Sequence, residues 1–232
     1  MGAAYGPLAE GRDQGGRPGA CAVLPRLSEV PVIVFAVDID SFWELIEECR
    51  AKAHGRAERL AWLEEELARK PVSEVVGFQV CLDRLCELGF TWELWAAAER
   101  IFGGWCSDDG FCYFRLWVVG LGRSAFERVV QSPDTLAEVP EVQRLVGRPR
   151  GAWGDDDWPE WEELDYVAAE AYERAPRGSD GFSTFHEAVD AQQGADEVVR
   201  EPLGKRWDVR DEVEAALRLP QLSSRFPVTL QP

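Results

Sequence analysis

Apolar residues recur every three or four positions through most of residues 38–175, and this spacing predicts a series of amphipathic helices. The first helix is predicted to begin near Asp40. Its apolar stripe consists of Ile39, Phe42, Trp43, Ile46 and Cys49. Further strong helical patterns cover residues 57–68, 73–88, 92–102, 107–121 and 160–175. Weaker patterns cover residues 125–130, 183–192 and 208–219.

Capping residues and glycines mark where these helices begin and end. Ser73, Thr91 and Ser107 each precede an apolar stripe, where a side-chain oxygen can accept a backbone N–H of the first turn. Gly89 and the Gly103–Gly104 pair follow the last apolar positions of two stripes, where glycine commonly ends a helix. Because no segment shows a persuasive β-hairpin pattern, the sequence predicts an all-α fold with a single multi-helix globular domain.

Composition divides the chain into three segments. Residues 1–37 begin with a stretch rich in Gly, Ala and Pro and are interpreted as a disordered extension. Residues 30–37 form an apolar run that suits a short strand, or that marks a translation start at Val37 and makes the preceding residues non-native. We expect the helical domain at residues 38–175, followed by a C-terminal extension with short helices and weak structure at 176–232.

Charge narrows the choice of partners. The chain has 42 acidic and 25 basic residues, a net charge of −17. Residues 37–175 account for most of it, with 29 acidic and 15 basic residues. Direct binding to nucleic acid is disfavoured, because such binding needs clustered cations that neutralise phosphates. The charge fits a basic protein partner, or serves only to keep the protein soluble.

The cysteine and histidine pattern suggests neither a metal nor a cofactor. No two of the six Cys show the two-residue gap of a zinc knuckle or redox pair, and the chain has only two His. We therefore expect buried, reduced thiols. The acidic run 155–157 lacks the alternating ligand spacing of a calcium loop, so we interpret it as part of a solvated loop over residues 147–159.

No segment suggests a membrane protein. The longest apolar run, residues 30–37, is far shorter than the roughly 20 residues that a membrane-spanning helix needs. The run also lacks the preceding basic residues and the terminal position of a secretion signal. We expect a cytoplasmic protein without a membrane partner.

The string Ser107-Asp108-Asp109-Gly110-Phe111 has a structural and a functional interpretation. Structurally, Ser107 caps a helix while Asp108 and Asp109 favour the positive end of the helix dipole. Functionally, the three residues contribute to a binding site. Arg115 stands within an apolar run on the same predicted helix, and a buried Arg is rare without a partner. It forms either a structural salt bridge or a contact with an anionic ligand or partner.

Tryptophans form a second group of candidate site residues. Trp43, Trp92 and Trp95 occur at helical spacing, as does Trp117. This spacing is typical of core residues. The alternative is an aromatic-walled groove for a peptide or a small molecule.

Several strings along residues 38–173 together resemble one protein family. They are Phe42-Trp43, Trp92–Ala97, Ser107–Phe111, Tyr113–Trp117 and Pro133–Ala137. In this order they resemble an uncharacterised bacterial family, domain of unknown function 4240. The resemblance implies a helical domain of about this length and no particular activity. The family sometimes occurs beside a WGR module in regulatory proteins, but this chain has no Trp-Gly-Arg signature.

Two hypotheses of function follow. The favoured one is a non-catalytic protein-interaction or regulatory module whose acidic surface binds a basic partner. The alternative is an enzyme or small-molecule binder with a pocket between the Asp108 helix and the Trp-bearing helices. No Ser/His/Asp arrangement, phosphate-binding glycine loop or two-His metal motif in the sequence supports a particular reaction.

Overall fold

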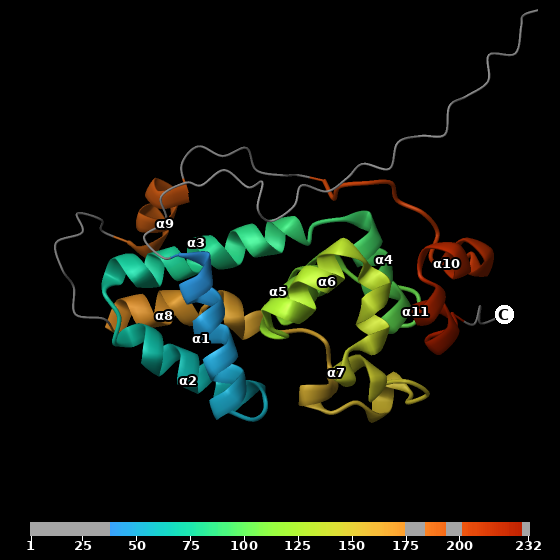
Figure 1. The fold of residues 1–232 in the computed structure, drawn as a ribbon, viewed down its shortest axis with the longest axis horizontal. Helices are drawn as coiled ribbons and strands as arrows, with labels where there is room; N and C mark the ends of the chain where they lie inside the picture. The colour runs from blue at the N-terminus through green and yellow to red at the C-terminus, as the bar shows by residue number, and fades with distance from the viewer. Residues whose placement is uncertain (1–37, 175–183, 194–200, 229–232) are drawn as a thin grey trace, which may run out of the picture. The chain divides into compact units, whose positions relative to one another are not determined.

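The computed structural model describes residues 38–174, 184–193 and 201–228, and the regular elements in these ranges are all helices (Figure 1). The all-α prediction is therefore confirmed. The extension at residues 1–37, with its predicted disorder, its alternative strand and the suggested start at Val37, lies outside the described residues.

Helices predicted between residues 38 and 131 are present within a few residues of their predicted bounds. They are α1 (Ile39–Lys52), α2 (Arg56–Ala68), α3 (Val72–Leu88), α4 (Trp92–Ile101), α5 (Asp108–Gly120) and α6 (Arg123–Gln131). The predicted stripe of α1 is buried at Phe42, Trp43, Ile46 and Cys49.

Two of the three predicted caps are confirmed. Thr91 Oγ1 accepts the N–H of Leu94 at 3.1 Å, and Ser107 Oγ accepts the N–H of Gly110 at 3.0 Å. The third prediction, Ser73, is wrong because α3 already begins at Val72, after Pro71. Proline has no N–H to leave unpaired and is well tolerated at the start of a helix.

Residues 132–174 contain short helical turns and one longer helix. These are η2 (Pro133–Glu138), α7 (Pro140–Gln143), η3 (Arg150–Ala152), η4 (Asp155–Asp157), η5 (Glu162–Asp165) and α8 (Val167–Arg174). The predicted helix over 160–175 is therefore wrong in its first half. The N–H of Trp161 donates to the carbonyl of Tyr113 on α5 at 3.0 Å, which ties the chain to another element where the first helical turn was expected.

The described residues after 183, for which only weak patterns were predicted, contain three helices. They are α9 (Phe185–Gln193), α10 (Glu212–Arg218) and α11 (Pro220–Arg225). Helix α9 packs on α3 and α8, and α11 packs on α4 and η2. An isolated parallel bridge joins Leu203 to Thr91, and the N–H of Trp92 donates to the Leu203 carbonyl at 2.9 Å.

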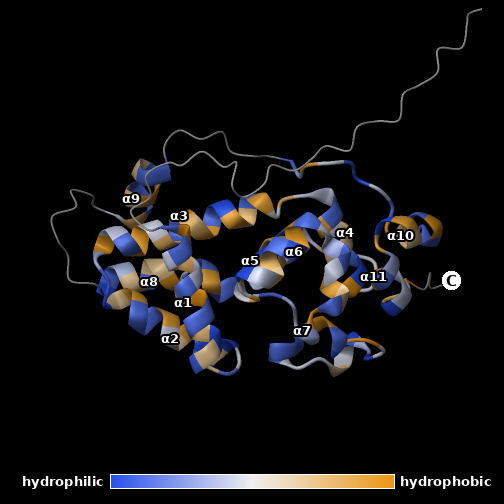
Figure 2. Cartoon of the chain, in the orientation of Figure 1, coloured by the Kyte–Doolittle hydropathy of each residue, from blue (hydrophilic) through white to orange (hydrophobic). Residues whose placement is uncertain are grey.

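Helices α3 and α5 form the centre of the core. In α3, residues 75–82 are buried consecutively, and in α5 the same is true of residues 116–120. The outer helices bury a single face, and Figure 2 shows the alternation of polar and apolar residues along them that amphipathic helices require. In the ranges that the structure describes, no helix combines the length and apolarity that a membrane crossing requires.

A buried arginine fastens residues 201–228 to the preceding helices. Arg100 on α4 is fully buried. Its Nη1 donates to the carbonyl of Val209 at 2.8 Å, and its Nη2 donates to that of Ser223 at 3.1 Å. Both nitrogens also bind the Glu212 carboxylate, at 3.0 and 3.1 Å. A buried guanidinium is stable only with partners of this kind, so the segment completes the core around α4.

We expect Arg100→Met to lower the free energy of unfolding by about 3 kcal/mol, because it strips two buried carbonyls of their donor and leaves Glu212 unpaired. Arg69→Met is the control, since the Arg69 side chain is 62% exposed. Its effect should stay below about 0.5 kcal/mol. Urea denaturation of the full chain measures both, and equal stability of the two variants would contradict the role given to Arg100.

Candidate functional site

The string Ser107–Phe111 begins helix α5, in the manner of the structural interpretation. Ser107 caps the helix, and Asp108 and Asp109 are exposed in its first turn. The helix dipole stabilises carboxylates at this position. Neither carboxylate forms an ion pair within the described part of the chain. Capping therefore accounts for these residues, and a binding role for them stays a prediction.

Arg115 is half-buried on α5 and contacts a carbonyl and two aromatic rings. Its Nη1 donates to the carbonyl of Cys86 at 2.9 Å. Its guanidinium lies 4.7 Å from the ring centre of Phe90 and 5.3 Å from that of Phe111, which is cation–π geometry. Among the described residues these contacts, rather than the predicted salt bridge, hold the side chain. A ligand contact through Arg115 stays a prediction.

Two carboxylates form a partly buried polar cluster beside Arg115. Asp83 on α3 accepts hydrogen bonds from the amides of Gln79, at 2.8 Å, and Gln193. Burial, reinforced by the nearby Asp165, raises the pKa of Asp83 to about 6. Burial also raises the pKa of Asp165, against the opposing effect of Arg115. The cluster joins α3, α9 and η5 through two carboxylates whose pKa values are raised by burial.

The predicted tryptophans do not form one group, because Trp43 lies apart from the stacked pair Trp92 and Trp95. Trp43 is buried in α1, and its ring centre lies 5.4 Å from that of Phe126. Trp92 stacks on Trp95 at 5.2 Å, and Trp95 stacks on Phe111 at 4.5 Å. Rings of α4 and α5 thus pack against each other where the alternative hypothesis places a pocket. A groove built on these three tryptophans stays a prediction.

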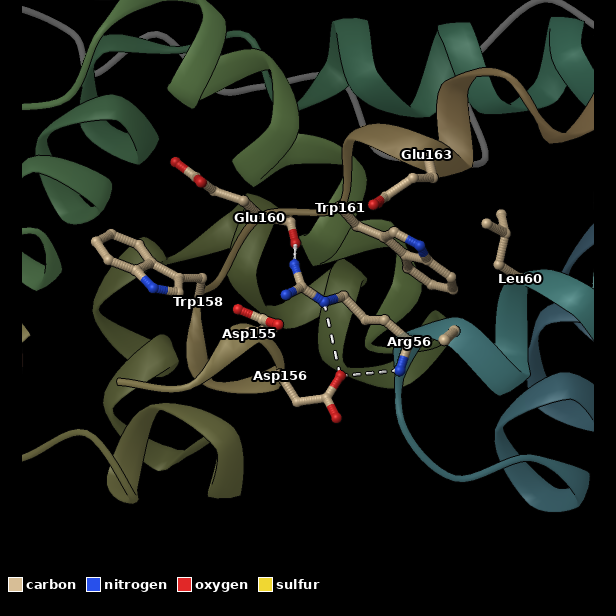
Figure 3. Close-up of a pocket in the computed structure, with 9 residues that line it drawn as sticks. Arg56, Leu60, Asp155, Asp156, Trp158, Glu160, Trp161 and Glu163 are labelled. Carbon is tan, nitrogen blue, oxygen red and sulfur yellow. Dashed lines mark hydrogen bonds and ion pairs between the residues drawn. The ribbon is translucent and has the colours of Figure 1, made fainter. Parts of the chain in front are cut away.

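A cleft of about 630 Å³ lies instead between the start of α2 and residues 155–163 (Figure 3). It is lined by four carboxylates, two indoles, one guanidinium and two aliphatic side chains. These belong to Arg56, Ala57, Leu60, Asp155, Asp156, Trp158, Glu160, Trp161 and Glu163. We call this hollow the acidic cleft.

Arg56, the single cation of the acidic cleft, is already bonded to its wall. Its Nη1 donates to the carbonyl of Glu160, and its Nε lies 3.8 Å from Oδ1 of Asp156 (Figure 3). The backbone N–H of Arg56 donates to the same oxygen at 3.1 Å. Asp156 thereby caps α2, whose N-cap residue, Gly55, has no side chain for that purpose. The Arg56 guanidinium therefore stabilises the wall of the cleft and is not available to a ligand.

The acidic run 155–157 is only partly the solvated loop that the sequence predicted. Both oxygens of Asp157 bind Arg148, at 2.7 and 3.1 Å, and one also accepts the N–H of Gly154 at 2.9 Å. These hydrogen bonds lower the pKa of Asp157 to about 2, and those from Arg148 have the largest effect. Asp156 is held by α2, so two of the three carboxylates fix the loop. Asp155 alone has no ion pair among the residues described.

Three carboxylates of the acidic cleft remain available to a ligand. Asp155, Glu160 and Glu163 make no ion pair in the described ranges. Burial raises the pKa of Glu160, although Arg56 nearby lowers it again. The cleft thus presents an excess of negative charge beside two indole side chains, of which Trp158 is partly exposed.

Helix α5 packs against two residues of the cleft wall, Glu160 and Trp161, through three of its own positions. At Gly110, a Cβ atom would lie 3.2 Å from Oε1 of Glu160. The carbonyl of Tyr113 binds the N–H of Trp161 at 3.0 Å. At Gly120, a Cβ atom would lie 2.6 Å from Cε3 of Trp161, closer than non-bonded carbons approach. The absence of a side chain at Gly120 is therefore what lets this indole lie against the helix.

Sequence reasoning missed the residues of this cleft, although one signal was present. Six of the nine residues over 155–163 are acidic, and two of the other three are Trp. This composition indicated a local acidic and aromatic surface. No pattern indicated the contact of Arg56 with Asp156, because these residues lie 100 positions apart.

Metal and thiol chemistry find no support in the described ranges. They contain no group of three or more His, Cys, Asp or Glu side chains placed to hold a metal ion. No disulfide joins any two of the described cysteines, Cys49, Cys81, Cys86, Cys106 and Cys112, whereas Cys21 lies outside the described residues. Burial raises their pKa values, to about 11 for Cys49, so these thiols are poor nucleophiles.

Gly120→Ala should destabilise the protein by about 1–2 kcal/mol, because the added methyl displaces the Trp161 ring. Helix propensity alone would favour Ala by roughly 1 kcal/mol, so the sign of the change is diagnostic. Gly151→Ala is the control, since a Cβ at Gly151 meets nothing within 4 Å. Urea denaturation measures both. A stabilised Gly120→Ala variant would contradict the packing described here.

Protonation of Asp83 should make stability depend on pH. Its folded pKa of about 6 lies above the roughly 3.9 of an unfolded Asp. The folded chain therefore binds this proton more tightly, and the stability that it contributes is complete below about pH 4 and lost as the pH rises through about 6. Asp83→Asn should flatten this decline, and the exposed Asp190→Asn should not. Urea denaturation at a series of pH values gives the free energy of unfolding for the native chain and both variants. If this free energy falls with pH equally in Asp83→Asn and Asp190→Asn, Asp83 is not the cause.

Comparison of the sequence with known protein families gives a match, and it covers the acidic cleft. The family described as Protein of unknown function (DUF4240) matches residues 37–174, which include every residue that lines the acidic cleft. Searches of curated proteins and of solved structures gave no significant match. Because the match covers more than half of the chain, the protein belongs to the DUF4240 family.

Proposed function

We propose that this domain is a non-catalytic protein-interaction module that binds a basic segment of a partner protein in the acidic cleft. One observation carries the proposal. Asp155, Glu160 and Glu163 border a cleft whose own cation, Arg56, is already bonded to Asp156 and to the Glu160 carbonyl. A Lys or Arg side chain of a partner supplies the missing positive charge.

The walls of the cleft suit such a side chain. Trp158 is partly exposed and offers an aromatic face, and a guanidinium or ammonium is attracted to the face of an indole ring. Carboxylates bind a guanidinium through paired, charge-assisted hydrogen bonds. Arg56 provides an internal example of a guanidinium held between these walls (Figure 3).

The charge of the chain supports the same partner. The net charge of −17 attracts a basic segment over distances of about 10 Å at moderate salt and speeds its encounter with the cleft. The same charge repels phosphate backbones, so nucleic acid is a poor competitor. We place this binding in the cytoplasm, where the sequence predicts the chain to reside.

Charge removal in the cleft tests the proposal. The double variant Asp155→Asn/Glu163→Gln should bind a short peptide that alternates arginine with serine about tenfold more weakly than the native chain, because two charge-assisted contacts are lost. Glu44→Gln/Asp190→Asn is the matched control, since it removes two charges from exposed positions on α1 and α9. Titration calorimetry measures both affinities.

The comparison of the two double variants separates a site from general attraction. The control should bind within about twofold of the native chain, because solvent-exposed charges far from the contact are screened. Equal weakening in both variants would mean that the peptide responds only to net charge. That result, or undetectable binding to the native chain, would contradict the proposal.

A further inference from the structure

A second hollow of about 330 Å³ adjoins the acidic cleft and has the opposite charge character. It lies beside the ends of α1 and α5 and shares Arg56, Asp156 and Trp161 with the acidic cleft. We call it the basic pocket. Its charged and titratable lining consists of His54, Arg56, Arg59, Arg144, Glu141 and Asp156.

Two guanidiniums of the basic pocket are available to a ligand. Arg59 donates through Nε to the carbonyl of Ala53 at 3.4 Å, and its terminal nitrogens have no hydrogen bond among the described residues. The side chain of Arg144 makes no ion pair in the same ranges. The pocket has two acidic side chains, Glu141 and Asp156. Because Asp156 is already bound to Arg56, only Glu141 offsets the charge of these two guanidiniums. In a chain with a net charge of −17, this local excess of cations is an exception.

The two hollows are adjacent, so a single ligand can reach both. Trp161 lines each of them, and the bonded pair of Arg56 and Asp156 forms the boundary that they share. Figure 3 shows this pair beside Trp161 at the edge of the acidic cleft. A ligand that spans the boundary therefore meets carboxylates on one side and guanidiniums on the other.

We infer that the basic pocket receives the C-terminal carboxylate of the partner whose basic side chain occupies the acidic cleft. The inference rests on the proposed function and makes it more specific. The recognised segment is then a chain end, with a Lys or Arg close to the terminus. A chain end carries both charges within a few atoms of each other, as the adjacent hollows require.

The charge of the pocket favours a carboxylate over a phosphate group. A carboxylate carries one negative charge and matches the planar fork of an Arg side chain. A phosphate group near neutral pH carries up to two charges. The carboxylate of Glu141 in the lining opposes the second charge.

Two forms of one peptide test this inference. The peptide alternates serine with arginine, ends in arginine and carries an N-terminal fluorescent label, and it is made with a free or an amidated C-terminus. Fluorescence anisotropy should show that the native chain binds the free form about tenfold more tightly, because charge-assisted hydrogen bonds to Arg59 and Arg144 are lost on amidation. The amidated form should still bind through the acidic cleft.

Variants assign the preference to the pocket. Arg59→Gln/Arg144→Gln should bind both forms equally, with the affinity that the native chain has for the amidated form. Arg69→Gln/Arg128→Gln removes two charges from side chains that are 62% and 52% exposed, and it should keep the preference. A preference that survives in Arg59→Gln/Arg144→Gln would overturn the assignment to this pocket.

The remaining outcomes separate this inference from the proposed function. Equal binding of both peptide forms to the native chain would overturn the chain-end inference and leave the basic-segment proposal standing. Binding of neither form would overturn both. Inorganic phosphate that displaces the free form more strongly than acetate, at equal ionic strength, would assign the pocket to a phosphorylated partner and overturn the inference.

Discussion

The contact between Trp161 and Gly120 determines where residues 148–166 lie, and the acidic cleft depends on that placement. This segment contains only short helical turns, which cannot hold a position without contacts to other elements. The indole is 3% exposed and occupies space that a Cβ at Gly120 would fill. Asp156 then meets the start of α2 at a distance of 3.1 Å from the Arg56 nitrogen. Removing the indole from α5 would release one wall of the cleft.

Negative and positive side chains are separated over a short distance in this protein, in addition to the net negative charge of the whole chain. The acidic cleft and the basic pocket share a boundary, and that boundary is itself an ion pair between Arg56 and Asp156. Arg56 and Asp156 neutralise each other, so neither charge offsets those of the other residues that line the two hollows. What remains outside the pair is negative on one side and positive on the other. Such an arrangement selects ligands by the order of their charges as well as by their sum.

Local features were predictable from the sequence, and features created by distant contacts were not. The caps at Thr91 and Ser107 were found because a capping oxygen and its N–H partner lie three residues apart. The helix expected from residue 160 was wrong at its start because Tyr113 takes the N–H of Trp161. The cleft escaped prediction for the same reason, since Asp156 reaches α2 across a long stretch of chain. Composition alone indicated an acidic and aromatic surface there.

The most direct test of the binding site is the response of the indole N–H signals in a nitrogen-15 NMR titration with a basic peptide. Substitution of single tryptophans by phenylalanine assigns each signal. Our account predicts that the signals of Trp158 and Trp161, which line the acidic cleft, shift in step with binding, while that of Trp43 on α1 stays in place. Shifts confined to Trp92 and Trp95, or none at Trp158 and Trp161 when the peptide is bound, would contradict it.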